Sequence, residues 1–186
     1  MAFSQHYHDE EGRREWQNPE SILSNIGLRP GNVVVDIGCG EGFFSLPAAR
    51  IVGPLGRVVG VDINEKAIGH LEKRAEAEKL RNIELVLSKA EEVVVCNGCA
   101  DFILFVIDLH DFEDPEKVLR NAKRMLKPTG RLIDLDWKKK MMVKGPPVWI
   151  RFDEVKATRL IEKAGFAIES VGDSGPMHYL IVAKPR

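Results

Sequence analysis

Short runs of β-branched residues alternate with helix-forming stretches along most of this chain, and that alternation restricts the fold more than any other feature. The runs are too short for helices and are bounded by glycine or proline, which favours buried strands. We expect strands over residues 32–37, 57–62, 83–87, 101–107 and 130–137. Helices are expected from Asn18 to Gly27, over 43–52, from Asn64 to Leu80, and from Asp114 to Pro128. Such alternation predicts a parallel sheet covered on both faces.

The C-terminal end of the chain departs from this alternation. A last helix is expected from Asp153 to Gly165, followed by strands over 166–171 and 177–183. Only Gly172–Pro176 connect those two strands, whereas a parallel crossover needs about a dozen residues or more. The final strand must therefore enter antiparallel. The predicted fold class is α/β, a doubly wound, Rossmann-like sheet of seven strands that is mostly parallel, with an antiparallel strand from a C-terminal hairpin.

Composition limits the class of protein. The 186 residues carry a formal net charge of -1 and are 44% hydrophobic, which suits one compact domain. A near-neutral chain lacks the bulk positive charge of a duplex-binding protein. No run approaches the roughly 18 apolar residues of a membrane span, and the N-terminus lacks the apolar region of a secretory signal. We therefore expect a soluble, cytoplasmic protein with no membrane span and no nucleic-acid partner.

The cysteines are Cys39, Cys96 and Cys99, an odd number that predicts no disulfide framework and fits a reducing compartment. A C-x-x-C pair can bind zinc or cycle as a disulfide. Zinc would need two further ligands, and no second Cys or His pair stands at a suitable spacing. A redox pair would open a helix, whereas this one precedes a predicted strand. We expect no metal site and no redox function.

The segment Asp36–Gly42, with the sequence DIGCGEG, lies between the first predicted strand and its helix. Glycines at such a turn let the backbone approach a ligand closely, and the helix N-terminus presents free N–H groups. The dinucleotide pattern G-x-G-x-x-G would require glycine at position 43, which is Phe43. A phosphate-binding Gly-Lys-Ser/Thr is also missing. The alternative is a tight strand-to-helix turn without a ligand.

Asp62 closes the second predicted strand, 24 residues after Gly38. An acidic side chain at this place can accept hydrogen bonds from both hydroxyls of a ribose. The glycine loop and Asp62 together indicate a nucleoside site. The alternative for Asp62 is a cap for the following helix.

These segments resemble class I S-adenosylmethionine-dependent methyltransferases, in particular the small type related to the ubiquinone/menaquinone-biosynthesis methyltransferases. The resemblance rests on VVDIGCGEG, VGVDI and LHDFEDPEKVLRNAKRMLKPTGRL, and it covers about residues 18–184. It implies S-adenosylmethionine as cofactor, S-adenosylhomocysteine as product, and an antiparallel seventh strand. Residues 18–186 would form a single cofactor-binding methyltransferase domain, preceded by an N-terminal lid or tail over residues 1–17.

The resemblance assigns cofactor-binding roles to Asp36, Gly38, Cys39, Gly40, Asp62, Ile63, Lys89, Ala90, Glu91 and Val106. The glycine loop would hold the methionine part, Asp62 the ribose, and Ile63 one face of the adenine. Relatives often place an acidic residue after the third strand, where this chain has Lys89. Backbone groups near Ala90 or the side chain of Glu91 would then contact the adenine edge.

The segment after the fourth predicted strand would carry the chemistry. Ligands of open α/β sheets lie beyond the carboxyl ends of the strands, at the switch point of strand order. In the family this segment passes beside the methyl group, so Val106, Asp108, Leu109 and His110 are candidates for the pocket wall. His110 is the candidate general base, because the unperturbed pKa of histidine, near ~6.5, suits proton transfer. Asp108 is a second catalytic candidate, and the alternative for His110 is a rim residue that shapes the loop.

Two segments could recognise a methyl acceptor. The N-terminal segment contains possible lid residues, namely Phe3, His6, Tyr7, His8, Arg13, Arg14 and Trp16, although a mobile tail is the alternative for residues 1–10. The loop 137–150 carries four lysines and two methionines, which are Lys138, Lys139, Lys140, Lys144, Met141 and Met142. The lysines could attract an anionic acceptor, or they could form a solvated surface.

The sequence therefore predicts a small S-adenosylmethionine-dependent methyltransferase that acts on a small-molecule acceptor. One alternative is a non-catalytic S-adenosylmethionine-binding module or subunit that needs a partner. Another is an NAD(P)-dependent oxidoreductase, which Phe43 and the reversed last strand disfavour. The sequence leaves a homodimer open.

Overall fold

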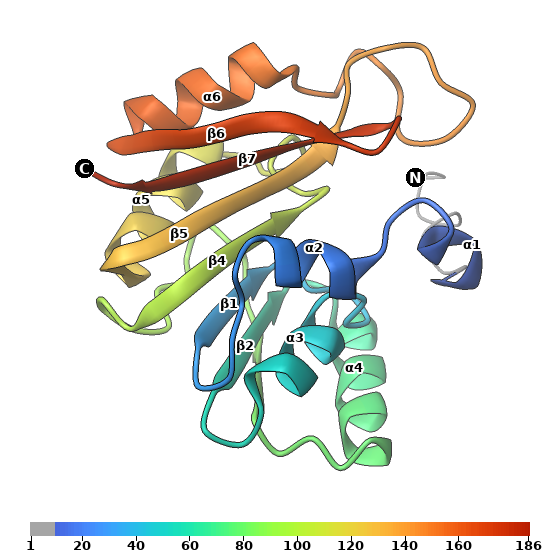
Figure 1. The fold of residues 1–186 in the computed structure, drawn as a ribbon, viewed down its shortest axis with the longest axis vertical. Coiled ribbons are helices and arrows are strands. Elements are labelled where there is room, and N and C mark those ends of the chain that lie inside the picture. The colour runs from blue at the N-terminus through green and yellow to red at the C-terminus, as the bar shows by residue number, and fades with distance from the viewer. Residues whose placement is uncertain (1–9) are drawn as a thin grey trace.

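A computed structural model describes residues 10–186, which form one seven-stranded sheet in the order β3-β2-β1-β4-β5-β7-β6 (Figure 1). The strands are β1 (Val33–Ile37), β2 (Arg57–Asp62), β3 (Ile83–Leu87), β4 (Ala100–Val106), β5 (Leu126–Trp137), β6 (Phe166–Ser174) and β7 (His178–Pro185). Strands β1 to β5 pair in parallel. Strand β7 is antiparallel to both β5 and β6. The predicted fold class is confirmed, and the strand order reverses between β1 and β4.

The helices are α1 (Glu10–Arg14), α2 (Pro19–Asn25), α3 (Ser45–Val52), α4 (Glu65–Ala77), α5 (Pro115–Met125) and α6 (Glu154–Lys163). The side chains of Asn18, Asn64, Asp114 and Asp153 each accept a backbone N–H at the helix that follows, so the four predicted caps are confirmed. The two faces of the sheet bury different cores. Val34 of β1 packs with side chains of α2 and α3, and its neighbour Val35 packs with those of α5 and α6.

Two boundaries differ from the prediction. Helix α5 ends at Met125, and β5 begins at Leu126 instead of residue 130. Pro128 has no N–H group and disfavours a helical residue before it, so the chain is already extended there. The β4–β5 register shifts in this segment, where Ala100 faces Leu126 and Phe102 faces Arg131.

Cys96 and Cys99 are joined in a disulfide, so the prediction of unpaired cysteines is wrong for these two residues. The turn before β4 brings their Cα atoms to 6.0 Å, a separation that a disulfide can span. Cys39 is free and buried.

Candidate active site

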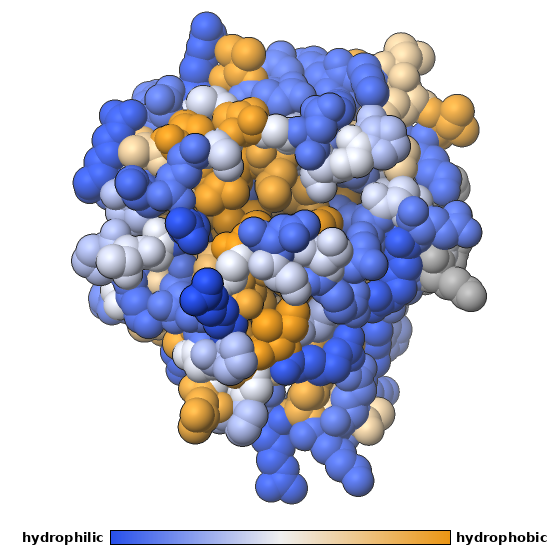
Figure 2. Space-filling view, viewed as in Figure 1, coloured by the Kyte–Doolittle hydropathy of each residue, from blue (hydrophilic) through white to orange (hydrophobic). Residues whose placement is uncertain are grey.

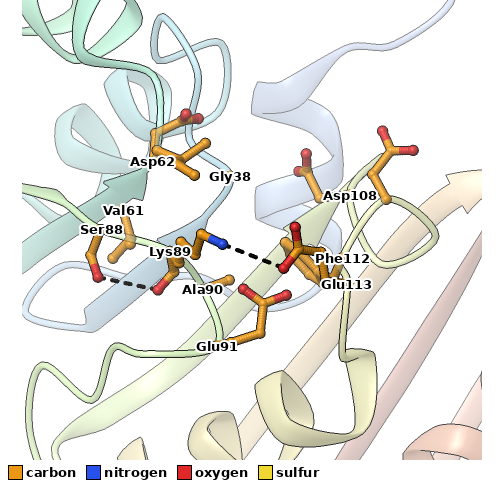
Figure 3. Close-up of a pocket in the computed structure, with 12 residues that line it drawn as sticks. Gly38, Val61, Asp62, Ser88, Lys89, Ala90, Glu91, Asp108, Phe112 and Glu113 are labelled. Atoms are coloured by element: carbon orange, nitrogen blue, oxygen red, sulfur yellow. Dashed lines mark hydrogen bonds and ion pairs between the residues drawn. The ribbon is translucent and has the colours of Figure 1, made fainter.

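A pocket of about 250 Å³ opens at the carboxyl ends of the parallel strands, where the loops after β1, β2, β3 and β4 meet (Figure 3). Its walls come from Gly38, Val61, Asp62, Ile63, Ser88, Lys89, Ala90, Glu91, Asp108, Asp111, Phe112 and Glu113. The pocket therefore lies at the reversal of strand order, where open α/β sheets bind ligands.

Gly38 lies at the closest approach of two loops. Its φ of +79° is in the left-handed region, and the N–H groups of Gly38 and Cys39 both donate to Val61 O, at 2.8 and 3.0 Å. A Cβ atom at position 38 would lie 2.5 Å from Cγ of Asp108. Glycine is required here because the Asp108 carboxyl group fills the space of a side chain.

Asp62 is fixed at the end of β2 by two backbone donors. Its carboxylate accepts the N–H of Gly40 and the N–H of Asn64, each at 2.8 Å. Asp62 thus links the glycine loop to the start of α4. Asn64 caps that helix, and the carboxylate of Asp62, which lines the pocket, has lone pairs left for further hydrogen bonds.

Two further carboxyl groups are buried beside the glycine loop. Asp36 accepts a hydrogen bond from Ser45 Oγ at 2.6 Å, yet burial and the charge of Asp62 raise the pKa of Asp36 to about 6. Burial and the neighbouring Asp36, Asp136, Asp62 and Asp111 raise the pKa of Asp108 well above its ordinary value. Oδ2 of Asp108 has no hydrogen-bond partner within residues 10–186. This group of carboxyls favours a cationic ligand, which would offset their mutual repulsion.

The rim of the pocket carries a salt bridge and an exposed apolar side chain, unlike the buried carboxyl groups of its interior. Lys89 Nζ and Glu113 Oε2 are 3.4 Å apart and connect the loops after β3 and β4 (Figure 3). Glu91 accepts the N–H of Asp114 at 3.3 Å. Ile63 is 64% exposed although it is large and apolar, so its side chain is available to a flat apolar ligand surface.

A histidine and a carboxylate form a buried pair next to this pocket. His110 Nδ1 lies 2.7 Å from Asp136 Oδ2, and both side chains are 1% exposed. Burial opposes the charged form of His110, but the hydrogen bond to Asp136 and the charges of Asp136 and Asp111 raise its pKa above 6.5. His110 Nε2 has no hydrogen-bond partner in the described part of the chain and lies 3.4 Å from Oδ1 of Asp111, a pocket residue.

The chain reaches this arrangement through an unusual backbone conformation. Ile107 has a φ of +70°, which is rare for a β-branched residue. Its N–H donates to Leu135 O at 2.8 Å, so the turn is fixed to β5. The residues that follow are Asp108, beside Gly38, and His110, beside Asp136. The strained turn therefore directs these two side chains to the two parts of the site.

Of the residues predicted to bind the cofactor, the pocket brings together Gly38, Asp62, Ile63, Lys89, Ala90 and Glu91, and the catalytic candidate Asp108 joins them. Asp36, Cys39, Gly40, Val106 and His110 do not line it. Gly40 donates its N–H to the wall residue Asp62, and Asp36 is bonded to Ser45, which lies outside the wall. Cys39 and Val106 belong to apolar cores. The roles of these residues stay predictions.

Several residues of the candidate site were not predicted from the sequence. Phe112 and Glu113 line the pocket, and Asp136 holds His110. A usable signal existed for Asp136, because a strand with the sequence LIDLDW places two acidic residues at alternate positions of an otherwise apolar run. Phe112 and Glu113 had no comparable signal, since their position depends on the course of the loop after β4.

The predicted lid is described only from residue 10, so Phe3, His6, Tyr7 and His8 lie outside the described residues. Glu10 forms an ion pair with Arg74 of α4, and the guanidinium of Arg13 lies 4.1 Å from the ring centre of Phe43. Trp16 stacks on His178 with ring centres 5.1 Å apart. Helix α1 is thus attached beside the glycine loop, and closure over a ligand stays a prediction.

Comparison with known proteins identifies the family. The model of a family described as "Methyltransferase domain" matches residues 28–165. The ubiquinone/menaquinone biosynthesis C-methyltransferase UbiE of Klebsiella pneumoniae is 32% identical over 154 residues, which are 80% of this chain and 58% of that protein. The demethylmenaquinone methyltransferase of Bacillus cereus is 28% identical over 118 residues, which are 63% of this chain and 50% of that protein. The chain spans little more than half the length of these curated relatives.

Solved structures agree with this result. A SAM-dependent methyltransferase from Aquifex aeolicus superposes with a TM-score of 0.88 and 30% identity, covering 92% of both chains. The [4+2]-cyclase SpnF has a TM-score of 0.77 at 15% identity, covering 90% of this chain and 80% of SpnF, and shows a shared fold alone. The chain belongs to the methyltransferase domain family. Within it, the chain is similar to S-adenosylmethionine-dependent methyltransferases such as the one from Aquifex aeolicus.

The pocket fits the cofactor of that family. Buried Asp36 and Asp108 suit the positive groups of S-adenosylmethionine, and Asp62 can accept the ribose hydroxyls. The exposed face of Ile63 suits the adenine. Within residues 10–186, no group of three or more His, Cys, Asp or Glu side chains could hold a metal ion, and no helix is long and apolar enough to cross a membrane.

We expect Gly38→Ala to weaken binding of S-adenosylhomocysteine by at least about tenfold, because the new Cβ would displace the Asp108 carboxyl group. Isothermal titration calorimetry measures this change. Gly31→Ala is the matched control, since Gly31 has a similar φ of +85° and no atom within 4 Å of the added Cβ. Equal affinity of the two variants would contradict the proposed cradle.

Asp36→Asn should stabilise the ligand-free protein above pH 6. The folded-state pKa of Asp36 is raised from 3.8 to about 6, so ionisation of the buried carboxyl costs folding free energy as pH rises through that window. Removing the charge should raise the free energy of unfolding by about 2–3 kcal/mol at pH 7.5 and should leave it almost unchanged below pH 4. Urea unfolding at both pH values tests this, with Glu72→Gln on the exposed side of α4 as control. A variant no more stable than the wild type at pH 7.5 would contradict the stated cost.

Proposed function

We propose that this protein methylates a ring carbon of a small, apolar hydroquinone-like acceptor, with His110 as the general base. The observation that carries the proposal is the buried His110–Asp136 pair, whose second ring nitrogen, Nε2, accepts or donates no hydrogen bond within the described residues. The names of the relatives support the acceptor class, because they are C-methyltransferases of ubiquinone and menaquinone biosynthesis.

The bound cofactor supplies a methyl group on a sulfonium, and transfer to carbon needs an electron-rich acceptor atom in line with that bond. A hydroquinone ring carbon becomes electron-rich when a neighbouring hydroxyl loses its proton. The protein therefore needs a group that takes this proton. His110 follows β4 at the edge of the sheet that holds the pocket, and its Nε2 lies 3.4 Å from Oδ1 of Asp111, which lines the pocket.

The Asp136 carboxylate determines which nitrogen of His110 acts. An ionised carboxylate only accepts hydrogen bonds, so Nδ1 of His110 carries a proton and Nε2 keeps its lone pair in the neutral ring. Nε2 can then take the hydroxyl proton of the acceptor. When the ring carbon takes the methyl group, the methyl–sulfur bond would break with its electron pair left on sulfur, and the ring carbon would then lose its own hydrogen as a proton to restore the aromatic ring. The resulting imidazolium is stabilised by Asp136 at 2.7 Å and by Asp111 at 3.4 Å. These two carboxyl groups are also the reason why the pKa of His110 is raised.

Water exclusion is the second contribution of the chain. The side chains of His110 and Asp136 are almost fully buried, and burial strengthens their interaction. The neighbours of these two residues in sequence, Leu109 and Leu135, are also buried, at 0% and 1% exposed. An apolar ring suits this environment better than a charged acceptor does.

His110→Ala should lower the single-turnover methylation rate by about 10²–10⁴-fold while S-adenosylhomocysteine binding stays within about twofold. The assay uses a 2-alkyl-1,4-naphthohydroquinone with a free ring carbon, followed by mass spectrometry. Because the base must be neutral, the wild-type rate should rise with pH through a value above 6.5 and then level off. Asp136→Asn should lower the rate and move this midpoint down, since a neutral amide no longer favours the imidazolium.

His70→Ala is the matched control for the base. His70 also pairs with a carboxylate, with Nδ1 2.9 Å from Glu41 Oε1, but its side chain is 58% exposed on α4. The His70→Ala variant should methylate the acceptor at the wild-type rate. The mono-O-methylated hydroquinones test the need for a hydroxyl, because the isomer blocked beside the free carbon should not react. An unchanged rate in His110→Ala would remove His110 from the mechanism, and cofactor binding without transfer to any tested acceptor would favour the non-catalytic alternative.

A further inference from the structure

The loop between β5 and α6, residues 138–150, is built around one buried guanidinium. Arg151 is 2% exposed. It donates to the carbonyl oxygens of Lys138, Lys140, Lys144 and Pro146 at distances of 3.2, 3.1, 3.2 and 2.7 Å, respectively. A charge taken out of water is tolerated only with such partners, so the guanidinium and the loop backbone stabilise each other. The loop therefore has a defined shape although it contains no helix or strand.

The underside of the same loop packs on the β5 end. The Arg151 guanidinium lies 5.5 Å from the ring centre of Trp137. Gly145 has a φ of +94°, and a Cβ there would lie 2.9 Å from the Trp137 ring. Glycine at this position allows the loop to lie flat on the tryptophan. The inner face of the loop is thus filled, and the remaining side chains project outward.

The outward side chains are unusually apolar. Met141 is 87% exposed, Val143 is fully exposed, and Trp149 is 79% exposed. In Figure 2 apolar side chains project from the surface at the upper right, where Figure 1 places this loop. Exposure of these apolar side chains to water is unfavourable. Their presence together on a loop of defined shape indicates that this loop contacts an apolar surface.

Lysines stand among these apolar residues. Lys138 is turned toward the protein and pairs with Asp173 at 2.7 Å. Lys139 and Lys140 are exposed, and no carboxylate of the described chain lies within ion-pairing distance of either. Lys144 is exposed as well. The whole chain has a net charge of -1, so this positive charge is a local feature of the loop.

We propose that residues 139–149 dock on the surface of an anionic phospholipid bilayer. Tryptophan, methionine and valine side chains partition into the headgroup and acyl boundary, and lysines beside them attract anionic headgroups. A protein partner would need acidic and apolar groups at matching places, whereas a bilayer offers both over any orientation. The proposal concerns binding alone and does not depend on the acceptor suggested above.

The position of the loop would determine how the protein is oriented on a bilayer. The loop follows β5 at the carboxyl edge of the parallel strands, the edge on which the pocket opens (Figure 1). Contact through the loop would turn that edge toward the bilayer. An apolar acceptor dissolved in the bilayer would then reach the site without crossing bulk water.

Flotation of the full chain with vesicles tests the proposal. Vesicles of phosphatidylcholine with 40% phosphatidylglycerol should carry the protein upward in the gradient, and vesicles of phosphatidylcholine alone should carry far less. Lys139→Gln/Lys140→Gln should weaken binding to the anionic vesicles by roughly tenfold or more. Met141→Ser/Val143→Ser should weaken it by a similar factor through lost apolar contact. Tryptophan emission should shift to shorter wavelength with anionic vesicles, and this shift should vanish in Trp149→Phe.

Matched controls lie on other surfaces of the protein. Lys73→Gln/Lys79→Gln removes two exposed lysines near α4, and Leu55→Ser removes an apolar side chain that is 89% exposed. Both should bind vesicles as the wild type does. The proposal would be overturned if the protein bound neutral and anionic vesicles equally, or if the control variants lost as much binding as the loop variants. It would also be overturned if the emission of the Trp149→Phe variant still shifted to shorter wavelength with anionic vesicles. Failure to bind either kind of vesicle would also overturn it and would leave the patch to a soluble protein partner.

Discussion

Repulsion among buried carboxyl groups is the constraint on which the rest of the site depends. Asp36 at the end of β1 and Asp108 after β4 are neighbours because those two strands pair, and Gly38 lies between them without a side chain. Their burial is unfavourable in the ligand-free protein, as the raised pKa values of both groups indicate. Folding free energy from the two apolar cores maintains this arrangement. We propose that a positively charged ligand offsets this cost.

The two halves of the sheet contribute to different parts of the candidate site. In the proposed function, strands β1 to β3 and their loops form the cofactor side, from the glycine loop to Lys89. Strand β5 would serve the acceptor side, because it supplies Asp136 to His110 and continues into the loop whose backbone Arg151 binds. The segment after β4 lies between them, and Ile107 in its left-handed conformation directs Asp108 to one side and His110 to the other. One strained residue thus connects the proposed cofactor site with the proposed general base.

Much of this arrangement could be predicted from local sequence. Alternating runs predicted the strands, and the five-residue connection between the last two strands predicted the reversed one. The glycine loop and Asp62 are local motifs, so they were found. Asp136 was missed although the alternating acidic residues of LIDLDW mark it, because its partner His110 lies 26 residues away. Arg151 was missed because its partners are backbone carbonyl oxygens, which carry no sequence signal. The disulfide depended on the geometry of a turn, and Phe112 and Glu113 on a loop path that periodicity does not describe.

Calorimetric titration with S-adenosylmethionine at pH 6, in buffers of different ionisation enthalpy, tests the central claim most directly. The pKa of Asp36 in the free protein is about 6, and a cationic ligand beside it should lower that pKa. Binding should therefore release protons at pH 6, and Asp36→Asn should remove most of the release. Binding without proton release, or with proton uptake, would contradict the claim that the carboxyl groups form the site of the positive charge.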